Sequence, residues 1–416
     1  MFFMITELFQ QALHINSPWL IKSIDFNAEE KRLDIQIDFK RGSTFEDPDA
    51  GDDEVKEYKA YDTVQKNWQH LNFFEHECHL HARVPRIKRD DGKVRLIPTP
   101  WEGKVSGFTL LFEALLIQLC KAMPVHNVSD LTGVSDHKIW RVLDTYIELA
   151  KMDEDYSDIS ILGMDETSIA KGHDYITLFV DLEERKTLHI SAGKDHKTVV
   201  DFVEVLEAKQ GDRSAIKQVS CDMSPAFIKG VKENMPEAEI TFDKFHIIKL
   251  INEAVDQVRR EEGSYTPILK GNRYIFLKNE SNLTEKQKII KEELSMAKLN
   301  LKSVRALQIR EAFQQIYVAE STEKFEGLLN NWYYWATHSQ LAPIVKVAKT
   351  IKRHWDGIVS WKKSQINNGI LEGLNSVLQA AKRKARGYKM QHFKTIAYLL
   401  TGKLDFSKIN ANCLPT

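Results

Sequence analysis

The feature of this sequence that most restricts its fold is the order of strand and helix signals between residues 160 and 242. Three apolar runs separated by short turns come first, within residues 160–195, and they predict three consecutive strands. An amphipathic helix over residues 196–209 follows, then a fourth strand, a helix that begins at Pro225, and a fifth strand. Hairpins join the first three strands in this prediction, and helical crossovers lead to the last two.

This order, βββαβαβ, matches the ribonuclease H-like fold. A chain of 416 residues is too long for one simple core, so we predict an α+β multidomain protein in which this fold forms one domain. Residues 243–351 are almost entirely helical in pattern, which predicts a helical domain inserted before the core is complete. The chain then returns with a long helix over residues 366–386.

A helix-turn-helix is predicted upstream of the core. An apolar helix over residues 108–123 stops at Pro124, a short helix and a turn at Gly133 follow, and Ser135 suits the N-cap of a third helix. In such a motif the last helix enters the major groove of DNA. The residues expected to face outward near its start are His137, Lys138 and Arg141. A plain three-helix connector would have the same pattern.

Three carboxylates stand where a metal-dependent active site would need them. Asp165 lies near the end of the first predicted strand and Asp222 at the end of the fourth, and these strands are neighbours in a ribonuclease H-like sheet. Glu372 is the only acid of helix 366–386, in a polar stripe at helical spacing. The other members of the stripe are Asn368, Asn375 and Gln379, followed by the cations Lys382, Arg383, Lys384 and Arg386. The alternatives are ordinary turn caps for the aspartates and a solvated helix face for Glu372.

Three acids of this kind suit the cutting of a phosphodiester. Carboxylate oxygens are ligands for Mg²⁺ or Mn²⁺, and two such ions about 3.5–4 Å apart can activate the attacking oxygen and stabilise the leaving one. We therefore expect two Mg²⁺ (or Mn²⁺) ions per active site. Such a centre can use water for cutting and a DNA 3′-hydroxyl for joining.

The charge of the chain is unevenly distributed. Residues 1–70 contain eight Lys and Arg and fourteen Asp and Glu, whereas residues 341–416 contain fourteen Lys and Arg and three Asp and Glu. The net charges, 8 − 14 = −6 and 14 − 3 = +11, indicate a polyanionic partner for the C-terminal quarter only. A solvated, lysine-rich helix surface is the alternative.

The composition indicates a globular protein that does not cross a membrane. No stretch approaches the roughly 18 apolar residues of a membrane span, and the N-terminus lacks the pattern of a signal peptide. We therefore expect a cytoplasmic location. The four cysteines are scattered without a CxxC pair, so they encode neither a disulfide framework nor a complete zinc ribbon.

Several long motifs resemble one family. MDET, CDMSPAFIKGV, TFDKFHIIKLINEAVDQVRR and ILEGLNSVLQAAKRKARGY are similar to strings of the ISL3 family of bacterial insertion-sequence transposases. The similarity extends upstream through HLNFFEHECHLHARVPR and GFTLLFEALL, so it covers nearly the whole chain.

The resemblance implies a DDE catalytic triad whose positions here are Asp165, Asp222 and Glu372, acting both as catalytic residues and as metal ligands. DKFH, with Asp243 and His246, resembles the DxxH string of related transposases. These two residues would then support the site or position DNA. A helix cap followed by a packed histidine is the alternative.

The implied function is that of a transposase, an enzyme of a mobile element. It would bind the terminal inverted repeats of its insertion sequence and catalyse Mg-dependent DNA strand cleavage and strand transfer. Its partner would be double-stranded DNA, at the element ends and at the target, with a homodimer in the synaptic complex near the bacterial nucleoid. No membrane and no small-molecule substrate are expected. The alternative is a catalytically silent DNA-binding regulator derived from a transposase.

The N-terminal part departs from the family pattern. The family begins with a zinc ribbon of two cysteine pairs, and the corresponding places here hold Asp47 and Ala50, and Arg89 and Asp91. We therefore predict a β-rich, degenerate zinc-ribbon-like unit in which a structural zinc is unlikely. The residues expected to touch DNA from this unit are Arg83, Arg86, Lys88 and Arg95.

The predicted domains follow from these assignments. They are the N-terminal unit at residues 1–104, the helix-turn-helix at 105–155, the ribonuclease H-like catalytic domain at 156–255 and 356–416, and the helical insertion at 256–355.

Overall fold

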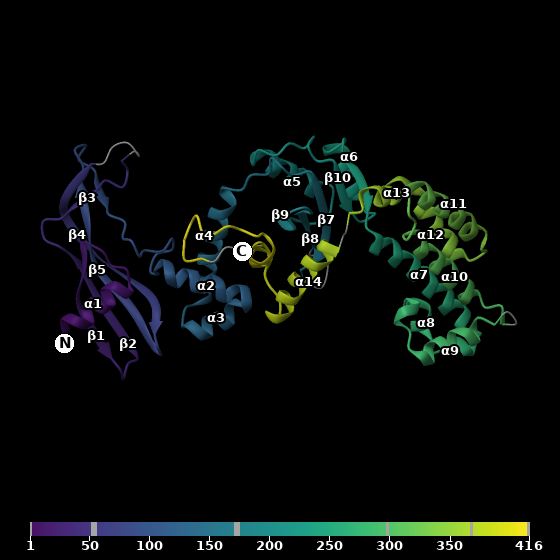
Figure 1. Ribbon diagram of the computed structural model, residues 1–416, viewed down its shortest axis with the longest axis horizontal. Helices are drawn as coiled ribbons and strands as arrows, with labels where there is room; N and C mark the ends of the chain where they lie inside the picture. The colour runs from purple at the N-terminus through teal and green to yellow at the C-terminus, as the bar shows by residue number, and fades with distance from the viewer. Residues whose placement is uncertain (1, 51–55, 170–174, 297–298, 367–368, 414–416) are drawn as a thin grey trace. The chain divides into compact units, whose positions relative to one another are not determined.

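The structure is a computed structural model that describes residues 2–50, 56–169, 175–296, 299–366 and 369–413 (Figure 1). The chain divides into two compact units. Unit 1 consists of Met1–Glu154 with Ala380–Thr416, and unit 2 consists of Asp155–Gln379. No helix among the described residues combines the length and the apolarity that crossing a membrane requires.

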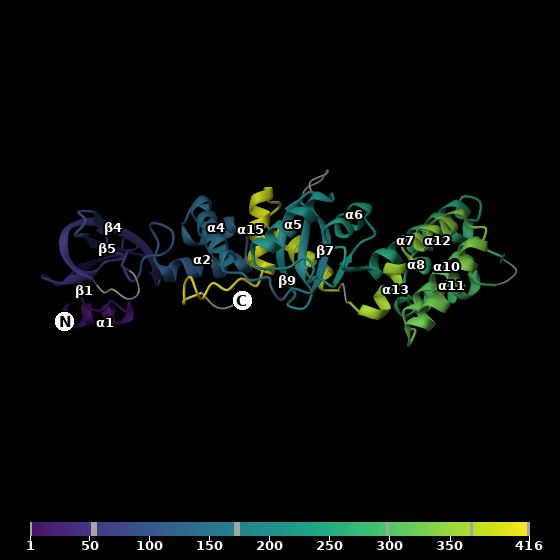
Figure 2. The ribbon, with the colours of Figure 1, turned by 90° about the horizontal axis from the view of Figure 1, so that it is seen from above.

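Unit 1 begins with helix α1 (Phe2–Ala12) and a six-stranded sheet. The strands are β1 (Trp19–Asn27), β2 (Arg32–Phe39), β3 (Thr44–Glu46), β4 (Glu57–Phe73), β5 (His76–Lys88) and β6 (Val94–Leu96). Their order is β1-β2-β5-β4-β3, with β6 beside β5. The antiparallel strands β4 and β5 pair along most of their length (Figure 2). The sequence pattern does not predict β4, because this strand is mostly polar and only Trp68 and His70 are buried.

The second part of unit 1 is helical and contains the predicted helix-turn-helix. Its helices are α2 (Leu110–Ala122), α3 (Val125–Thr132) and α4 (Asp136–Met152). Gly133 ends α3 with a φ of 70°, a left-handed conformation that favours glycine. Ser135 occupies the N-cap position of α4 as predicted, although its side chain makes no capping hydrogen bond.

A hydrogen-bond network around Glu113 and a hydrogen bond from α15 hold α4 in this part of unit 1. The Glu113 carboxylate accepts hydrogen bonds from the backbone N–H groups of Lys104 and Val105 and from the Tyr146 hydroxyl of α4. The C-terminal helix α15 (Met390–Thr401) packs on α4, where the Thr395 hydroxyl donates to the Asp144 carboxylate at 2.7 Å. Residues near the C-terminus therefore complete the core around α4.

Unit 2 contains a five-stranded sheet with the predicted succession of elements. The strands are β7 (Ile161–Ser168), β8 (Tyr175–Asp181), β9 (Lys186–Ala192), β10 (Gln218–Cys221) and β11 (Glu239–Phe242), and the helices among them are α5 (Lys197–Ala208) and α6 (Pro225–Asn234). The order is β11-β10-β7-β8-β9. The first three strands are antiparallel, whereas β10 is parallel to β7 and β11 is parallel to β10.

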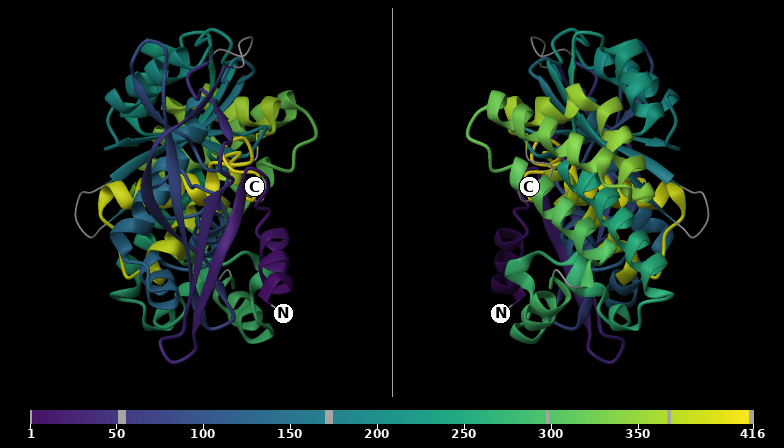
Figure 3. Two further views of the ribbon diagram at one scale, coloured as in Figure 1. Left: turned by 90° about the vertical axis from the view of Figure 1, so that its left-hand side faces the viewer. Right: turned by 90° about the vertical axis from the view of Figure 1, so that its right-hand side faces the viewer.

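The remainder of unit 2 is helical, as the sequence predicts. Its helices are α7 (Lys244–Gly263), α8 (Arg273–Leu277), α9 (Glu285–Leu294), α10 (Lys302–Ile316), α11 (Thr322–His338), α12 (Ala342–Arg353), α13 (Trp355–Ser364) and α14 (Gly369–Lys384), of which α14 extends into unit 1 after Gln379. The right-hand view of Figure 3 faces the green helices of this region. One hydrophobic core runs from the sheet into these helices. At their junction Gly357 of α13 meets Phe242 of β11, where a Cβ atom would lie only 2.4 Å from the ring.

Candidate active site

Three aspartates come from the parallel strands of unit 2. Asp165 lies within β7, Asp222 directly follows β10, and Asp243 directly follows β11. Because β7, β10 and β11 are parallel and adjacent, their carboxyl ends meet at one edge of the sheet, which is where open α/β sheets bind ligands. The alternation of strands and crossovers in the sequence therefore brings together residues that are far apart in the chain.

The electrostatics of Asp165 show that these side chains are close enough to interact. The pKa of the Asp165 carboxyl is raised to about 6, chiefly by burial and also by the negative charges of Asp222 and Asp243. The His246 imidazole and the Glu166 backbone N–H, which donates to Asp165 at 2.8 Å, act in the opposite direction. Within the described part of the chain, no lysine or arginine forms an ion pair with Asp165 or Asp222. The edge is therefore a partly buried acidic cluster near which His246 is the cationic group, and no described lysine or arginine pairs with Asp165 or Asp222.

The helix α14 lies against β7 through the polar stripe predicted from the sequence. A Cβ atom on Gly163 would lie 3.0 Å from Leu371 of α14, so glycine at this position permits the close approach. The Asn375 side chain donates a hydrogen bond to the Asp165 carboxylate and accepts one from the Thr167 hydroxyl. Gln379 donates to the Ser168 carbonyl at 3.2 Å. Asn368, the first member of the stripe, lies outside the described residues.

Asn375 is the residue of this site whose role the sequence analysis did not predict. It holds the Asp165 carboxylate from the helix, and it is itself oriented by Thr167. The only signal in the sequence was the amide at helical spacing from Glu372, and that signal does not specify a partner.

Glu372 is exposed on α14, three residues before Asn375. Residues at this spacing have Cβ atoms about 5–6 Å apart on a helix. Glu372 and Asp243 both line a cavity of about 1150 Å³. In the part of the chain that the structure describes, no three His, Cys, Asp or Glu side chains are arranged to hold a metal ion. The structure thus groups Asp165 with Asp222 and Asp243. It places Glu372 on the helix that contacts Asp165, but it does not bring Glu372 and the aspartates together as a set of metal ligands.

The chemistry of this donor set fits a hard divalent cation. Carboxylates, with the amide of Asn375 beside them, provide the oxygen ligands that Mg²⁺ and Mn²⁺ prefer. The positive charge of a cation at this edge would offset the two causes that raise the pKa of Asp165, which are burial and neighbouring negative charge.

Asp243 and His246 occupy the start of α7. The Asp243 carboxylate accepts a hydrogen bond from the Phe245 backbone N–H at 2.8 Å and so caps the helix, and its other oxygen lies 3.8 Å from Nε2 of His246. The capping role proposed as the alternative is therefore present. Both side chains also act electrostatically on Asp165, so capping does not remove them from the site.

The residues predicted to contact DNA from the helix-turn-helix are exposed near the start of α4. These residues are His137, Lys138 and Arg141. The Lys138 ammonium lies 5.8 Å from the centre of the Phe108 ring. At the end of α14, Lys382 is half-buried, whereas Arg383, Lys384 and the following Arg386 are exposed.

The predicted DNA-contacting residues of the N-terminal sheet already have partners there. Arg83 pairs with Asp38 at 2.9 Å, and Arg86 pairs with Asp62. The Lys88 ammonium lies 5.5 Å from the centre of the Tyr61 ring. To bind DNA, the guanidinium groups of Arg83 and Arg86 would have to contact a phosphate in addition to these carboxylates or in place of them.

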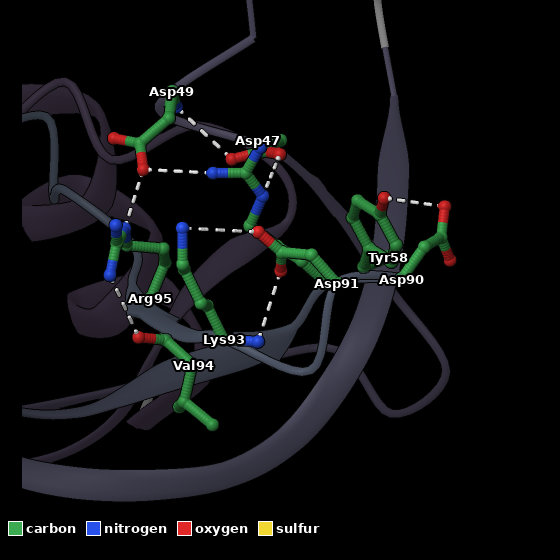
Figure 4. A network of polar contacts seen from close by, with 9 residues as sticks. Asp47, Asp49, Tyr58, Asp90, Asp91, Lys93, Val94 and Arg95 are labelled. Carbon is green, nitrogen blue, oxygen red and sulfur yellow. Dashed lines mark hydrogen bonds and ion pairs between the residues drawn. The ribbon is translucent and has the colours of Figure 1, made fainter.

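An ion-pair network joins the two segments of unit 1 in which the resemblance places the zinc ligands (Figure 4). Arg89 contacts the buried Asp47 carboxylate at 2.9 Å and the Asp49 carboxylate at 3.0 Å, and Arg95 also pairs with Asp49. The Arg95 guanidinium lowers the pKa of the Asp49 carboxyl. These contacts connect the turn after β3 with the hairpin between β5 and β6.

Two family models match this chain, one over most of unit 2 and one over the helix-turn-helix of unit 1. A family model for the DDE proteins of the ISL3 group, described as a transposase, matches residues 162–397, which contain all of the sheet of unit 2 except its first residue, Ile161. The chain belongs to the ISL3 family of transposases. A second model, described as the helix-turn-helix domain of transposase family ISL3, matches residues 97–147.

Two relatives from bacteria support the membership in the ISL3 family. The chain is 28% identical over 344 residues to the transposase for insertion sequence element IS1001 from Bordetella parapertussis, which covers 80% of this chain and 84% of that protein. It is 24% identical over 358 residues to the transposase for insertion sequence element IS1557 from Mycobacterium tuberculosis, with 78% of each protein covered. The helix-turn-helix match implies DNA binding, and DDE transposases generally use divalent metal ions.

Proposed function

We propose that this ISL3 transposase binds the terminal inverted repeats of its insertion sequence and catalyses Mg-dependent strand cleavage and strand transfer at the sheet edge of unit 2. The observation that carries the proposal is the acidic cluster of Asp165, Asp222 and Asp243, which has no compensating lysine or arginine among the described residues and to which α14 is attached through Asn375. Asp165, Asp222 and Glu372 are the proposed catalytic residues and metal ligands.

The strand order of unit 2 supports a ribonuclease H-like core. Three antiparallel strands followed by two parallel ones, in the order β11-β10-β7-β8-β9, are the arrangement that this fold requires. In that fold the catalytic carboxylates come from the first strand, from the end of the fourth strand, and from a helix packed beside them. β7, β10 and α14 correspond to these three elements.

The residues of this chain have distinct tasks in the proposed reaction. The metal ions, when bound, would activate the attacking oxygen and stabilise the leaving oxygen of the phosphodiester. Asn375 fixes the orientation of the Asp165 carboxylate, since it donates to one oxygen while the Glu166 N–H holds the other. His246, whose Nε2 atom lies 3.8 Å from the Asp243 carboxylate, would support the cluster. The exposed cations at the end of α14 would bind phosphates of the DNA.

End recognition would belong to unit 1. α4 exposes His137, Lys138 and Arg141 near its N-terminus, which is the part of a recognition helix that reads base edges. DDE recombination brings two element ends together, so we propose a homodimer in the complex with DNA. The enzyme would act on bacterial DNA in the cytoplasm, at the nucleoid.

The test is an assay with purified protein, DNA that carries the element ends, and Mg²⁺. The Asp222→Asn variant should lose nicking and joining while it binds end DNA as well as the wild type does. The Arg141→Ala variant should bind end DNA more weakly by about 1 kcal/mol or more, because base-edge and phosphate contacts are each worth this much. Binding by the wild-type protein without any nicks would favour a silent regulator descended from a transposase and would overturn the proposed catalysis.

A further inference from the structure

A second polar cavity lies along α7, beyond the candidate active site. It has a volume of about 590 Å³, and one face of α7 lines it from Phe245 to Arg260, with Arg273 and Leu277 contributed by α8. It shares Phe245 and Asn252 with the larger cavity that Glu372 lines. The two cavities are therefore neighbours along one helix, whose first residue follows Asp243.

The charge of this cavity is positive. Its lining contains four cations and two acids, namely Lys249, Arg259, Arg260 and Arg273 with Glu253 and Asp256. Asp256 pairs with Arg259 at 2.9 Å, Arg260 at 3.4 Å and Arg273 at 3.5 Å. One carboxylate cannot neutralise three guanidinium groups, so the cluster retains a positive charge that attracts an anion.

The three arginines differ in exposure, and the difference separates their roles. The Arg259 side chain is only 13% exposed and holds Asp256, whereas Arg260 is 67% and Arg273 is 58% exposed. Arg260 and Arg273 therefore have N–H donors that reach the cavity and the solvent. A guanidinium presents five donors, more than a single carboxylate can accept, and phosphate oxygens suit the remaining ones.

Two further residues of the cavity suit a nucleobase. Asn252 lines the cavity, and its buried Oδ1 atom has no hydrogen-bond partner in the described parts of the chain. This arrangement is costly, and a rotation of the side chain that brings the amide to a base edge would relieve it. Phe245 is 54% exposed at the start of α7, although it is a large apolar side chain. Exposed aromatic rings beside cations are typical of single-strand binding, where bases stack on the ring.

We propose that this cavity binds a single strand of DNA, with a base on Phe245, a base edge at Asn252 and phosphates on Arg260 and Arg273. A single strand is required because the flat face and the edge of a base are covered by neighbours in a duplex. Asp243 and Asp256 are separated by about 20 Å along α7 at the rise of an α-helix, which corresponds to several nucleotides. The strand would thus pass from the carboxylate edge along α7, an assignment that rests on the proposed function.

The experiment measures binding of a labelled single-stranded oligonucleotide of mixed sequence, and of the same sequence as a duplex, in EDTA. Arg260→Ala/Arg273→Ala should bind the single strand at least about tenfold more weakly, and the slope of log K against log salt should fall by about 1.4, which corresponds to two lost phosphate contacts. Arg259 remains to pair with Asp256 in this variant, so the fold is retained. The matched control is Lys286→Ala/Arg305→Ala, which removes two exposed cations of the same helical region that do not line the cavity.

Three single variants at two positions separate binding from folding. Phe245→Ala should weaken single-strand binding roughly 5- to 100-fold, and Phe245→Trp should restore it, because stacking requires only a ring. Asn252→Leu removes the unpaired buried oxygen, so it should raise the melting temperature and yet weaken single-strand binding. A residue with only a structural role would not produce this combination.

If the double variant and its control bound the single strand with equal affinity, the proposed site would be refuted. It would also be refuted if the double variant lost affinity equally for the single strand and for the duplex. The outcomes also separate this site from the proposed catalysis. Arginine-dependent single-strand binding by a wild-type protein that never nicks DNA would leave the site intact and refute the catalytic proposal. Normal nicking with unchanged single-strand binding in the variants would refute the site alone.

Discussion

Two acidic clusters of this protein have opposite electrostatic environments. In the N-terminal sheet, Asp47 and Asp49 contact Arg89 and Arg95, and the pKa of the Asp49 carboxyl is lowered by the Arg95 guanidinium. At the sheet edge of unit 2, Asp165 lies near Asp222 and Asp243 without such a cation, and burial with these neighbours raises its pKa to about 6. The same residue type is thus stabilised as a carboxylate in one place and destabilised in the other.

The difference indicates which cluster is complete by itself. A carboxylate that is paired with arginine satisfies its charge within the chain and can serve as a cross-link between turns. A carboxylate cluster without arginine is stabilised most by an external cation. Carboxylates whose pKa is raised by burial and by neighbouring charges are typical of functional sites. We infer that the cluster in the N-terminal sheet stabilises unit 1, and that the cluster at the sheet edge of unit 2 binds metal ions.

The largest expected effect concerns the proposed metal centre at the acidic sheet edge of unit 2. Glu372→Gln should reduce Mg-dependent nicking by about 10³-fold or more, equivalent to about 4 kcal/mol of transition-state stabilisation, because one ligand of the proposed metal centre is lost. Nicking of supercoiled DNA that carries the element ends measures this effect. Glu280→Gln is the matched control, since Glu280 is an exposed acid of the same cavity. Equal nicking activity of the two variants would show that Glu372 is not a metal ligand.

The next effect concerns the paired cluster. Arg89→Ala leaves the Asp47 carboxylate, whose side chain is 2% exposed, without its cation, and should destabilise the N-terminal sheet by about 3 kcal/mol. Hydrogen exchange at the amides of β5 measures the loss. Asp47→Ala added to Arg89→Ala should recover much of it, because no buried charge remains. The control is Arg83→Ala, whose exposed pair with Asp38 should contribute about 1 kcal/mol or less. Equal losses for Arg83→Ala and Arg89→Ala would contradict the cross-link.

A smaller effect of opposite sign is expected for Asp165→Asn. Because the pKa of Asp165 in the folded protein lies above the value of 3.8 for an unperturbed carboxyl, the folded state binds the proton more tightly, and stability falls as the pH rises from about 4 to about 6. In EDTA at pH 7.5 the variant should therefore be more stable than the wild type by about 2 kcal/mol, and the difference should disappear near pH 4.

Urea unfolding in EDTA at the two pH values measures this difference for Asp165→Asn. The control is Asp201→Asn, which replaces an exposed aspartate of α5. A variant less stable than the wild type at pH 7.5 would show that Asp165 is not in an unfavourable environment.

The smallest expected effect is stabilisation by the metal. At Mg²⁺ concentrations about ten times the dissociation constant, the wild-type protein should gain about 1.4 kcal/mol, since only the folded site binds the ion. Thermal unfolding with and without Mg²⁺ measures the gain. Asp222→Asn should lose it, whereas Arg89→Ala should keep it, because the paired cluster has no part in metal binding. Loss of the Mg²⁺ effect in both variants would refute the distinction between the clusters.

The sequence alone determined the order of strands and helices in unit 2, the three helices that precede them, and the placement of Asp165 and Asp222 at one edge of the sheet. These features follow from local periodicity and from turn and cap residues, which act over a few positions. The polar strand β4 escaped prediction because it lacks such a periodicity.

Only the tertiary structure decided which polar groups meet. Asn375 contacts Asp165 across 210 positions of the chain, and Arg89 contacts Asp47 from the hairpin between β5 and β6. Whether a carboxylate is neutralised depends on which side chains fold next to it, and helical or strand periodicity carries no information about a partner so far away. The charge state of each acidic cluster, and hence its role, is therefore a property of the folded chain.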